Sequence, residues 1–154
     1  LERTMSQPFR FYFRVRYGEC DAQKVVFNAR YGDYTDISIT EYFRAIGYEQ
    51  EMVSAELDFQ LVKQTTQWKA PAHYDEIVEA RIACTHTGNT SFSLQVAFRL
   101  AGTEQLLCEC ETVYVLIDKH TQAKRPLDDE LRRRLQTGAP GVVTDHAGWS
   151  KKQN

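Results

Sequence analysis

Alternation of apolar and polar residues recurs in several separate segments of this chain. From Phe9 to Tyr17 the odd positions are apolar and most even positions are arginine, and the same period of two continues over 78–84, 92–100 and 106–110. Successive side chains of a strand point to opposite faces of a sheet, so this period predicts strands with one buried face. Such a sheet needs a cover on its apolar side.

The cover is predicted between the first two strands. Residues 29–47 carry an apolar stripe with the i, i+3, i+4, i+7 spacing of an amphipathic helix. The stripe consists of Ile39, Tyr42, Phe43 and Ile46. Asn28 is expected to cap the start of this helix and Gly47 to end it. A helix of this length can lie along a sheet and cover its apolar face.

The remaining segments complete one domain, residues 1–154. Residues 57–70 predict a further strand whose apolar residues change parity, which indicates a bulge near 61–63. Residues 113–117 are apolar on both faces, so that end of the last strand should be covered twice. Turn signals between successive strands predict antiparallel neighbours. A short helix is predicted over 127–135, followed by an extended or partly disordered tail over 137–154.

Composition narrows the class of function. The 154 residues carry a formal net charge of -2 and a pI near 6.1, which offers no positive field for nucleic acid. No run approaches the roughly 18 apolar residues of a membrane-spanning helix. The first residues lack the apolar core of a signal peptide. We therefore expect a cytoplasmic protein that neither binds nucleic acid nor spans a membrane.

Metal and cofactor signals are weak. The four cysteines are expected to be free thiols, since a chain of this length and setting does not need disulfides. Cys108 and Cys110 share a strand face, but without a second ligand pair core packing is the better interpretation. The four histidines are dispersed, with no H-x-x-x-H or H-E-x-x-H spacing. No metal and no other cofactor is predicted.

The segment from Tyr17 to Tyr31 places a carboxylate, Asp21, after the first strand and a helix start soon afterwards. A helix start offers unpaired backbone N–H groups and the positive end of the helix dipole. The pair can act as a nucleophile or base beside donors that hold a developing oxyanion. An Asp in such a loop is also a common turn residue, so both interpretations stand. The neighbouring Cys20 lacks an evident basic partner, which makes it a poor candidate nucleophile.

The order of strand, Asp loop, Val25-Val26-Phe27, Asn28 and a tyrosine-rich helix resembles the hot-dog-fold acyl-CoA thioesterases, particularly the branch around 4-hydroxybenzoyl-CoA thioesterase. The resemblance is most specific over Phe11 to Gly47. It implies an α+β hot-dog fold, with an antiparallel five-stranded sheet wrapped around one long central helix. It also implies an acyl-CoA thioesterase that hydrolyses a fatty or aromatic acyl-CoA without a cofactor.

The resemblance also implies roles for individual residues. Asp21 corresponds to the family's catalytic residue, acting as nucleophile or general base, and the backbone N–H of Asn28 to the group that polarises the thioester carbonyl. Two stretches should contact the substrate, one at the helix start and one in the turn before the fourth strand, where coenzyme A binds. They are Phe27, Arg30 and Tyr31, and Gly88, Asn89, Thr90 and Ser91. Lys124 and Arg125 are further candidates for the phosphates. Arg132 to Arg134 is better interpreted as a solvated helix face.

Hot-dog proteins usually place their sites at subunit boundaries. The resemblance and the doubly apolar residues 113–117 together imply a homodimer or a tetramer of two dimers. The substrate would be a thioester of coenzyme A or of an acyl carrier protein.

Two departures from the family pattern bear on the site. Lys24 stands where a Gly is common three residues after the Asp, which predicts a changed loop shape or an added cation. Asn28 stands where many relatives have His or Tyr, so Asp21 is left more clearly alone. The alternative function is a hot-dog protein that holds a thioester without hydrolysing it, or a dehydratase-like protein. Hot-dog dehydratases use a His, and none lies between Phe9 and Glu56.

Overall fold

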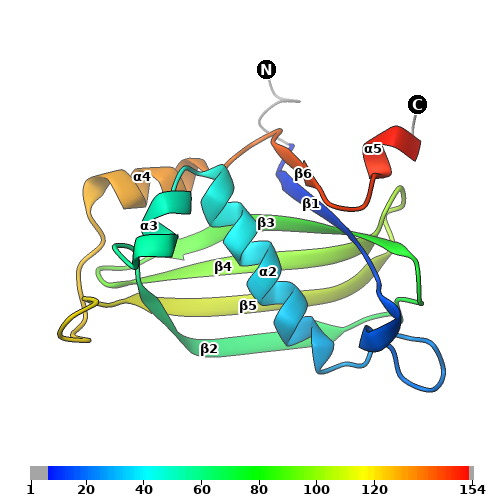
Figure 1. The fold of residues 1–154 in the computed structure, drawn as a ribbon. Coiled ribbons are helices and arrows are strands. Elements are labelled where there is room, and N and C mark those ends of the chain that lie inside the picture. The colour runs from blue at the N-terminus through cyan, green and yellow to red at the C-terminus, as the bar shows by residue number, and fades with distance from the viewer. Residues whose placement is uncertain (1–6, 153–154) are drawn as a thin grey trace.

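The computed structural model describes residues 7–152. They form one six-stranded sheet in the order β2-β5-β4-β3-β1-β6, and the long helix α2 lies across its inner face (Figure 1). The strands are β1 (Phe9–Arg14), β2 (Phe59–Trp68), β3 (Ile77–Thr87), β4 (Ser91–Leu100), β5 (Leu106–Leu116) and β6 (Val143–Asp145). The helices are the 3-10 turn η1 (Tyr17–Glu19), α2 (Arg30–Ala45), α3 (Glu49–Ser54), α4 (Asp129–Thr137) and α5 (Trp149–Lys152).

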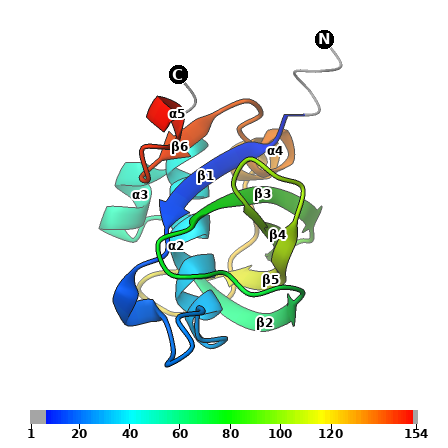
Figure 2. The same cartoon turned by 90° about the vertical axis from the view of Figure 1, so that its right-hand side faces the viewer.

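The strands predicted from the alternation are all present. Neighbours among β1 to β5 pair antiparallel. However, β2 pairs with β5 and not with β3, so the predicted pairing of these two successive strands is wrong. The register shift between Leu61 and Lys63 confirms the predicted bulge in β2. The sheet exceeds the predicted five strands because β6 adds a sixth, parallel to β1. Figure 2 shows the sheet end-on, curved around α2. The predicted α+β arrangement of one sheet around one long helix is therefore confirmed.

Helix α2 buries its predicted stripe against the sheet. Tyr42 and Phe43 have no exposed surface, and neither has Phe92 on the facing strand β4. The rings of Phe43 and Phe92 lie 5.8 Å apart, edge to face, in a geometry that aromatic pairs prefer. Burying one such side chain contributes roughly 1.5–3 kcal/mol. These aromatic contacts therefore hold the helix on the sheet.

The ends of α2 follow the prediction only in part. Gly47 lies just beyond the helix with a φ of +97°, the left-handed conformation that favours glycine after a helix, so the predicted stop is confirmed. At the start, the capping position is Ala29, already in helical conformation, and no side chain caps the helix. The predicted side-chain cap at Asn28 is therefore wrong.

The sequence predicted one of the shorter helices, α4, but not α3. The predicted helix after Pro126 is α4, shifted by two residues because Asp128 caps it by accepting a hydrogen bond from the Leu131 amide at 2.7 Å. Helix α3 was not predicted, since none of its residues is buried and it has no apolar stripe. None of the helices within residues 7–152 is long and apolar enough to cross a bilayer.

The predicted double cover at the end of β5 is incomplete in one chain. Leu116 and Ile117 are 1% and 4% exposed, and the chain returns over this end because Ile117 pairs with Lys124. Val113 and Val115, on the outer face, are only partly buried.

The tail over 137–154, expected to be extended or partly disordered, is built onto the sheet as far as residue 152. Its three residues in β6 pair with β1 from Arg10 to Tyr12, and Trp149 of α5 stacks on the Tyr12 ring at 5.9 Å. A three-residue strand and a four-residue helix are too short to leave a periodic signal. Tertiary contacts with β1 therefore order this segment.

Asp145 joins β6 to α5. Its carboxylate accepts hydrogen bonds from the amides of Ala147, Trp149 and Ser150 at 3.0, 3.1 and 2.9 Å. Burial by itself would raise the pKa of Asp145, but the three amides lower it from 3.8 to about 2. A carboxyl group whose pKa is lower in the folded state stabilises fully above its unfolded pKa. This contribution is lost as the pH falls from 3.8 towards 2.

We predict that Asp145→Ala loosens the tail by about 1 kcal/mol at neutral pH, the scale of a lost helix cap. The measurement is hydrogen exchange of the β6 amides in the wild-type and variant proteins. The difference between them should shrink as the pH is lowered through the range between the two pKa values. A difference that stays constant down to acid pH would contradict this role of the carboxylate.

Candidate active site

The chain after η1 forms a small hairpin of residues 20–27, here named the Asp21 loop. Its two arms meet at the bridge between Cys20 and Val26, and the Asp21 amide donates a hydrogen bond to the Val25 carbonyl at 2.9 Å. In Figure 1 the loop lies at the lower right, between the end of β1 and the start of α2. The predicted carboxylate therefore sits on a hydrogen-bonded turn.

A second segment, just before β3, holds the Asp21 loop from the other side. The Val26 amide donates to the Ala72 carbonyl at 2.8 Å, and the Tyr74 amide donates to the Lys24 carbonyl at 2.9 Å. Residues far apart in the sequence thus fix the loop through its backbone. No pattern in the sequence pointed to this support, because backbone hydrogen bonds of a loop place no demand on side-chain type.

Lys24 occupies the tight bend of the loop. Its φ is +63°, a left-handed conformation that costs a residue with a side chain roughly 1–2 kcal/mol. The bend is closed by the Lys24 amide, which donates to the Asp21 carbonyl at 2.9 Å. Lysine therefore adopts a conformation that suits glycine, and its exposed side chain adds a cation near the loop.

The Asp21 side chain is exposed, and its two oxygens differ. One accepts a hydrogen bond from the Gln23 amide at 2.8 Å, the local bond that makes Asp a common turn residue. Within residues 7–152 the other oxygen accepts no hydrogen bond. The turn role and the chemical role are thus compatible, since one oxygen holds the turn while the other faces solvent.

The start of α2 supplies the predicted donors. The Arg30 amide donates to the Phe27 carbonyl at 2.8 Å, and the Tyr31 amide to the Asn28 carbonyl at 3.2 Å. The Asn28 amide lies just before these two donors in the sequence. It donates no hydrogen bond to any group of the described chain. Trp68, at the end of β2, donates its Nε1–H to the Asn28 carbonyl at 3.3 Å. This hydrogen bond helps to fix the helix start. The sequence placed Trp68 within a predicted strand but did not indicate this contact.

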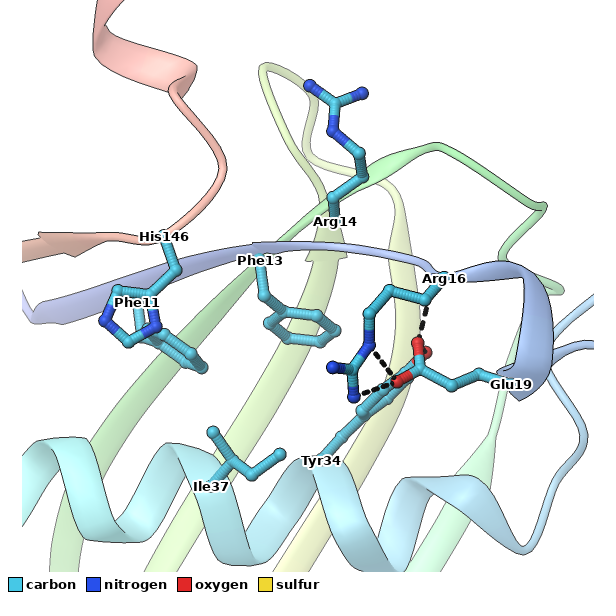
Figure 3. A pocket seen from close by; sticks show the side chains of 8 residues that line it. All are labelled: Phe11, Phe13, Arg14, Arg16, Glu19, Tyr34, Ile37 and His146. Carbon is cyan, nitrogen blue, oxygen red and sulfur yellow. Dashed lines mark hydrogen bonds and ion pairs between the residues drawn. The ribbon is translucent and has the colours of Figure 1, made fainter.

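Glu19 is the other carboxylate near the loop, and its surroundings are different. It is 8% exposed. Its Oε1 accepts from the Arg16 amide and from the Tyr34 hydroxyl, both at 2.8 Å, and its Oε2 accepts from the Arg16 guanidinium at 2.7 Å (Figure 3). Burial opposes its ionisation, but the hydrogen bonds from Arg16 and Tyr34 keep the pKa of Glu19 below its ordinary value. Glu19 is a structural anion with no free oxygen for a substrate.

The three residues expected to contact substrate at the helix start do not share one environment. Phe27 is 56% exposed and Arg30 is also exposed beside the loop. Tyr31 is only 3% exposed, with its ring 5.4 Å from those of both Tyr34 and Phe98. Its hydroxyl has no hydrogen-bond partner in the described chain. Tyr31 is therefore part of the core beneath the loop.

The turn from Gly88 to Ser91 lies elsewhere. Strand β3 begins opposite Arg14, near the Asp21 loop, and ends at Thr87, so the turn that includes Asn89 and Thr90 is at the other end of the sheet (Figure 1). One chain therefore does not bring the expected coenzyme A residues to Asp21.

Other nucleophile and metal candidates gain no support. Burial, with the carboxylates of Glu19 and Asp21 nearby, raises the pKa of the Cys20 thiol, which disfavours a reactive thiolate. All four cysteines are free, and Cys108 and Cys110 are buried. Within residues 7–152 no group of three or more His, Cys, Asp or Glu side chains could hold a metal ion.

A family model matches most of this chain. The model of the Thioesterase-like superfamily matches residues 15–135. These residues include the Asp21 loop, α2, β2 to β5 and most of α4. All of β1 and the tail with β6 and α5 lie outside the matched region.

Known proteins agree with this match. The acyl-CoA thioester hydrolase YbgC of Escherichia coli is 32% identical over 121 residues, which cover 77% of this chain and 89% of that protein. The gentisyl-coenzyme A thioesterase BH1999 superposes with a TM-score of 0.70 at 24% identity, over 82% of this chain and 98% of the other. The 1,4-dihydroxy-2-naphthoyl-CoA thioesterase Slr0204 of Synechocystis superposes with a TM-score of 0.73 at 18% identity, over 82% and 94%.

The two structural matches show the fold, and the family model and YbgC show the family. The predicted resemblance to hot-dog thioesterases and the predicted class of enzyme, a thioester hydrolase, are confirmed. This chain belongs to the Thioesterase-like superfamily.

Proposed function

We propose that the protein hydrolyses acyl-CoA at the Asp21 loop, with Asp21 as nucleophile or general base and the Asn28 N–H as donor to the thioester carbonyl. One observation carries the proposal. An unengaged carboxylate oxygen and an unengaged helix-start amide belong to the same short segment, and backbone hydrogen bonds hold that segment in place.

Thioester hydrolysis suits so small a set of groups. The sulfur of a thioester donates its lone-pair electrons only weakly to the carbonyl group, so the carbonyl carbon stays electrophilic. The thiolate then leaves without strong acid assistance. As a base, Asp21 takes a proton from water while the water oxygen adds to the carbonyl carbon, and the C–S bond then breaks. As a nucleophile, Asp21 displaces the thiolate and forms an anhydride that water hydrolyses. In both routes the Asn28 amide stabilises the oxygen that becomes negative.

The substrate proposed is a fatty or aromatic acyl thioester of coenzyme A or of an acyl carrier protein. Aromatic acyl groups gain support from the names of the two structural relatives, gentisyl- and 1,4-dihydroxy-2-naphthoyl-CoA thioesterase. The reaction as proposed uses no cofactor, because the carboxylate and the amide supply the required base and oxyanion donor. A cytoplasmic location remains our expectation.

The turn at the far end of the sheet is the proposed site of the coenzyme A phosphates. The Asn89 and Thr90 carbonyls are engaged by the amides of Leu127 and Leu116, at 2.9 and 2.8 Å, whereas the amides of Asn89 and Thr90 donate to no backbone group of the described chain. The Leu127 contact also brings the preceding Lys124 and Arg125 to this end of the sheet. Free amides with nearby cations are suited to anions. In α4, Glu130 pairs with Arg133 and Arg134, which supports a structural role for those arginines.

We also propose a homodimer joined through β2. This strand is an edge of the sheet and exposes Leu61, Val62 and Trp68 by 47%, 57% and 50%. An edge strand presents unpaired backbone N–H and C=O groups, which are a template for pairing with another strand. A two-fold axis pairs β2 with its copy antiparallel, so the turn end of one sheet lies towards the Asp21 end of the other. Each site would then combine the two groups that one chain keeps apart, and two such dimers could form a tetramer.

One observation bears on the alternative, a thioester-binding or dehydratase-like protein. The backbone of His73 pairs with Val25 in the Asp21 loop, and the His73 ring lies 3.0 Å from the Glu76 carboxylate. A His and a carboxylate from a distant segment therefore lie beside the Asp21 loop, although no His occurs between Phe9 and Glu56 in the sequence. Free-thiol release from a panel of acyl-CoAs, compared with hydration of 2-enoyl-CoA, separates the two functions.

We predict that Asp21→Asn lowers thioester turnover at least about a hundredfold, the lower range for a positioned acid–base group. The fold should stay intact because the amide oxygen can still accept the Gln23 hydrogen bond. Asp129→Asn, an exposed acid in α4, is the matched control and should be silent. Glu19 is unsuitable as a control because its carboxylate is buried and paired. Near wild-type turnover by Asp21→Asn would refute the mechanism.

Asn28 separates backbone from side-chain chemistry. We predict that Asn28→Ser keeps activity within a few-fold, since no side chain caps the helix and the backbone donor is unchanged. Asn28→Pro removes that donor and should lower the chemical rate by roughly a hundredfold or more. Circular dichroism must first show that the proline variant folds, because proline also restricts Phe27. An active Asn28→Pro beside an inactive Asn28→Ser would assign the role to the side-chain amide.

We predict that Leu61→Lys combined with Val62→Lys converts the dimer to a monomer, because charges on an edge strand prevent pairing. Sedimentation equilibrium measures the mass, and thiol release measures the activity that should fall with it. Val53→Lys, at a more exposed apolar residue in α3 rather than β2, is the control. A wild-type monomer with full activity would contradict the shared site.

A further inference from the structure

A pocket of about 230 Å³ lies between β1, α2 and the chain that follows β6 (Figure 3). Three of its lining residues, Phe11, Phe13 and Arg14, precede the region matched by the family model, and His146 follows that region. Asp21 is not among the residues that line it. The pocket is therefore distinct from the Asp21 loop, and the added C-terminal segment forms one of its walls.

Most of the pocket wall is apolar. The rings of Phe11 and Phe13 are stacked with centroids 5.5 Å apart, and the His146 ring meets Phe11 edge-on at 5.0 Å. Ile37 of α2 faces them and is 41% exposed. A concave apolar surface with a few polar groups is the usual form of a small-molecule site. Its 230 Å³ falls below the roughly 300–1,000 Å³ of sites for drug-sized ligands, which favours a compact molecule over a long acyl chain.

The polar end of the pocket is held in place before any ligand arrives. Figure 3 shows the Arg16 side chain pointing towards the pocket, bound to Glu19, whereas Arg14 points away. The Nε and Nη2 groups of Arg16 bind Glu19, and its Nη1 has no partner within residues 7–152. The side chain is 74% exposed, so this nitrogen is accessible. Pairing with a buried carboxylate restricts the guanidinium and lowers the entropy lost on binding.

The polar groups that face the pocket select the charge of the ligand. Both oxygens of Glu19 already accept hydrogen bonds, and the Tyr34 hydroxyl donates one of these bonds. Within residues 7–152, the Arg16 Nη1 and the His146 ring are lining groups that make no hydrogen bond, and the charge of Glu19 is already paired with Arg16. Guanidinium binds carboxylate through well-matched donors. A ligand with an anionic acceptor at one end and an apolar body at the other fits both parts of the pocket.

We propose that this pocket binds a small apolar carboxylic acid, with its carboxylate at Arg16 and its ring or branched chain against Phe13 and Ile37. Binding does not depend on the proposed function. The acid released by the proposed hydrolysis nevertheless belongs to this chemical class, so the pocket would sense a product outside the Asp21 loop.

The test titrates the full chain with benzoate, followed by NMR chemical shifts and calorimetry. We expect a Kd on the order of 1 mM, and binding at least about tenfold weaker for benzamide, which has the same shape without the charge. Ile37→Glu places a carboxylate in the pocket and should weaken benzoate binding at least about tenfold. Val53→Glu, at an exposed position in α3 that does not line the pocket, should leave it unchanged.

Asp21→Asn distinguishes the pocket from the Asp21 loop, because it should bind benzoate as the wild type does. Loss of binding in Asp21→Asn would place the ligand at the catalytic loop and overturn the proposal. Equal binding of benzamide, unchanged binding in folded Ile37→Glu, or no binding at about ten times the expected Kd would overturn it as well. None of these results depends on thioester turnover, so failure here is separable from failure of the proposed function.

Discussion

Tyr42 and Phe43 of α2 pack against the sheet with no exposed surface, and this packing determines where the helix lies. The helix in turn determines where its first backbone amides point. Trp68 of β2 fixes the same end by donating to the Asn28 carbonyl. The proposed oxyanion donor is therefore positioned by the hydrophobic core through one rigid helix, which is how a backbone group can be held in place without a dedicated side chain.

The two carboxylates of the segment show how surroundings divide roles between similar groups. Glu19 is buried, accepts three hydrogen bonds and is paired with Arg16. Removing that partner would leave an uncompensated buried charge, so Glu19 serves stability. Asp21, two residues later, is exposed and keeps one oxygen without a partner. Only the second carboxylate can approach a substrate without dismantling its own supports.

The C-terminal tail adds a layer beyond the region matched by the family model. It widens the sheet by adding β6 beside β1, packs Trp149 on Tyr12, and contributes His146 to the pocket beside α2. Asp145 holds these parts together through three backbone amides. A short extension can thus create a concave surface because it packs against an existing edge strand and a neighbouring helix. The pocket thus combines residues of the matched region, such as Tyr34 and Ile37, with His146 from the tail.

The sequence alone determined strands β1 to β5, the long helix and its apolar stripe, because periods of 2 and 3.6 can be read from the order of residues. It also located the β2 bulge and marked Asp21. Tertiary structure decided the rest. The β6 pairing, the support of the Asp21 loop by residues 72–74 and the approach of His73 to Val25 all depend on backbone contacts between distant segments. Backbone groups are the same in nearly every residue, so such contacts leave no mark in the sequence. The burial of Tyr31 and Glu19 was decided in the same way, by what packs around them.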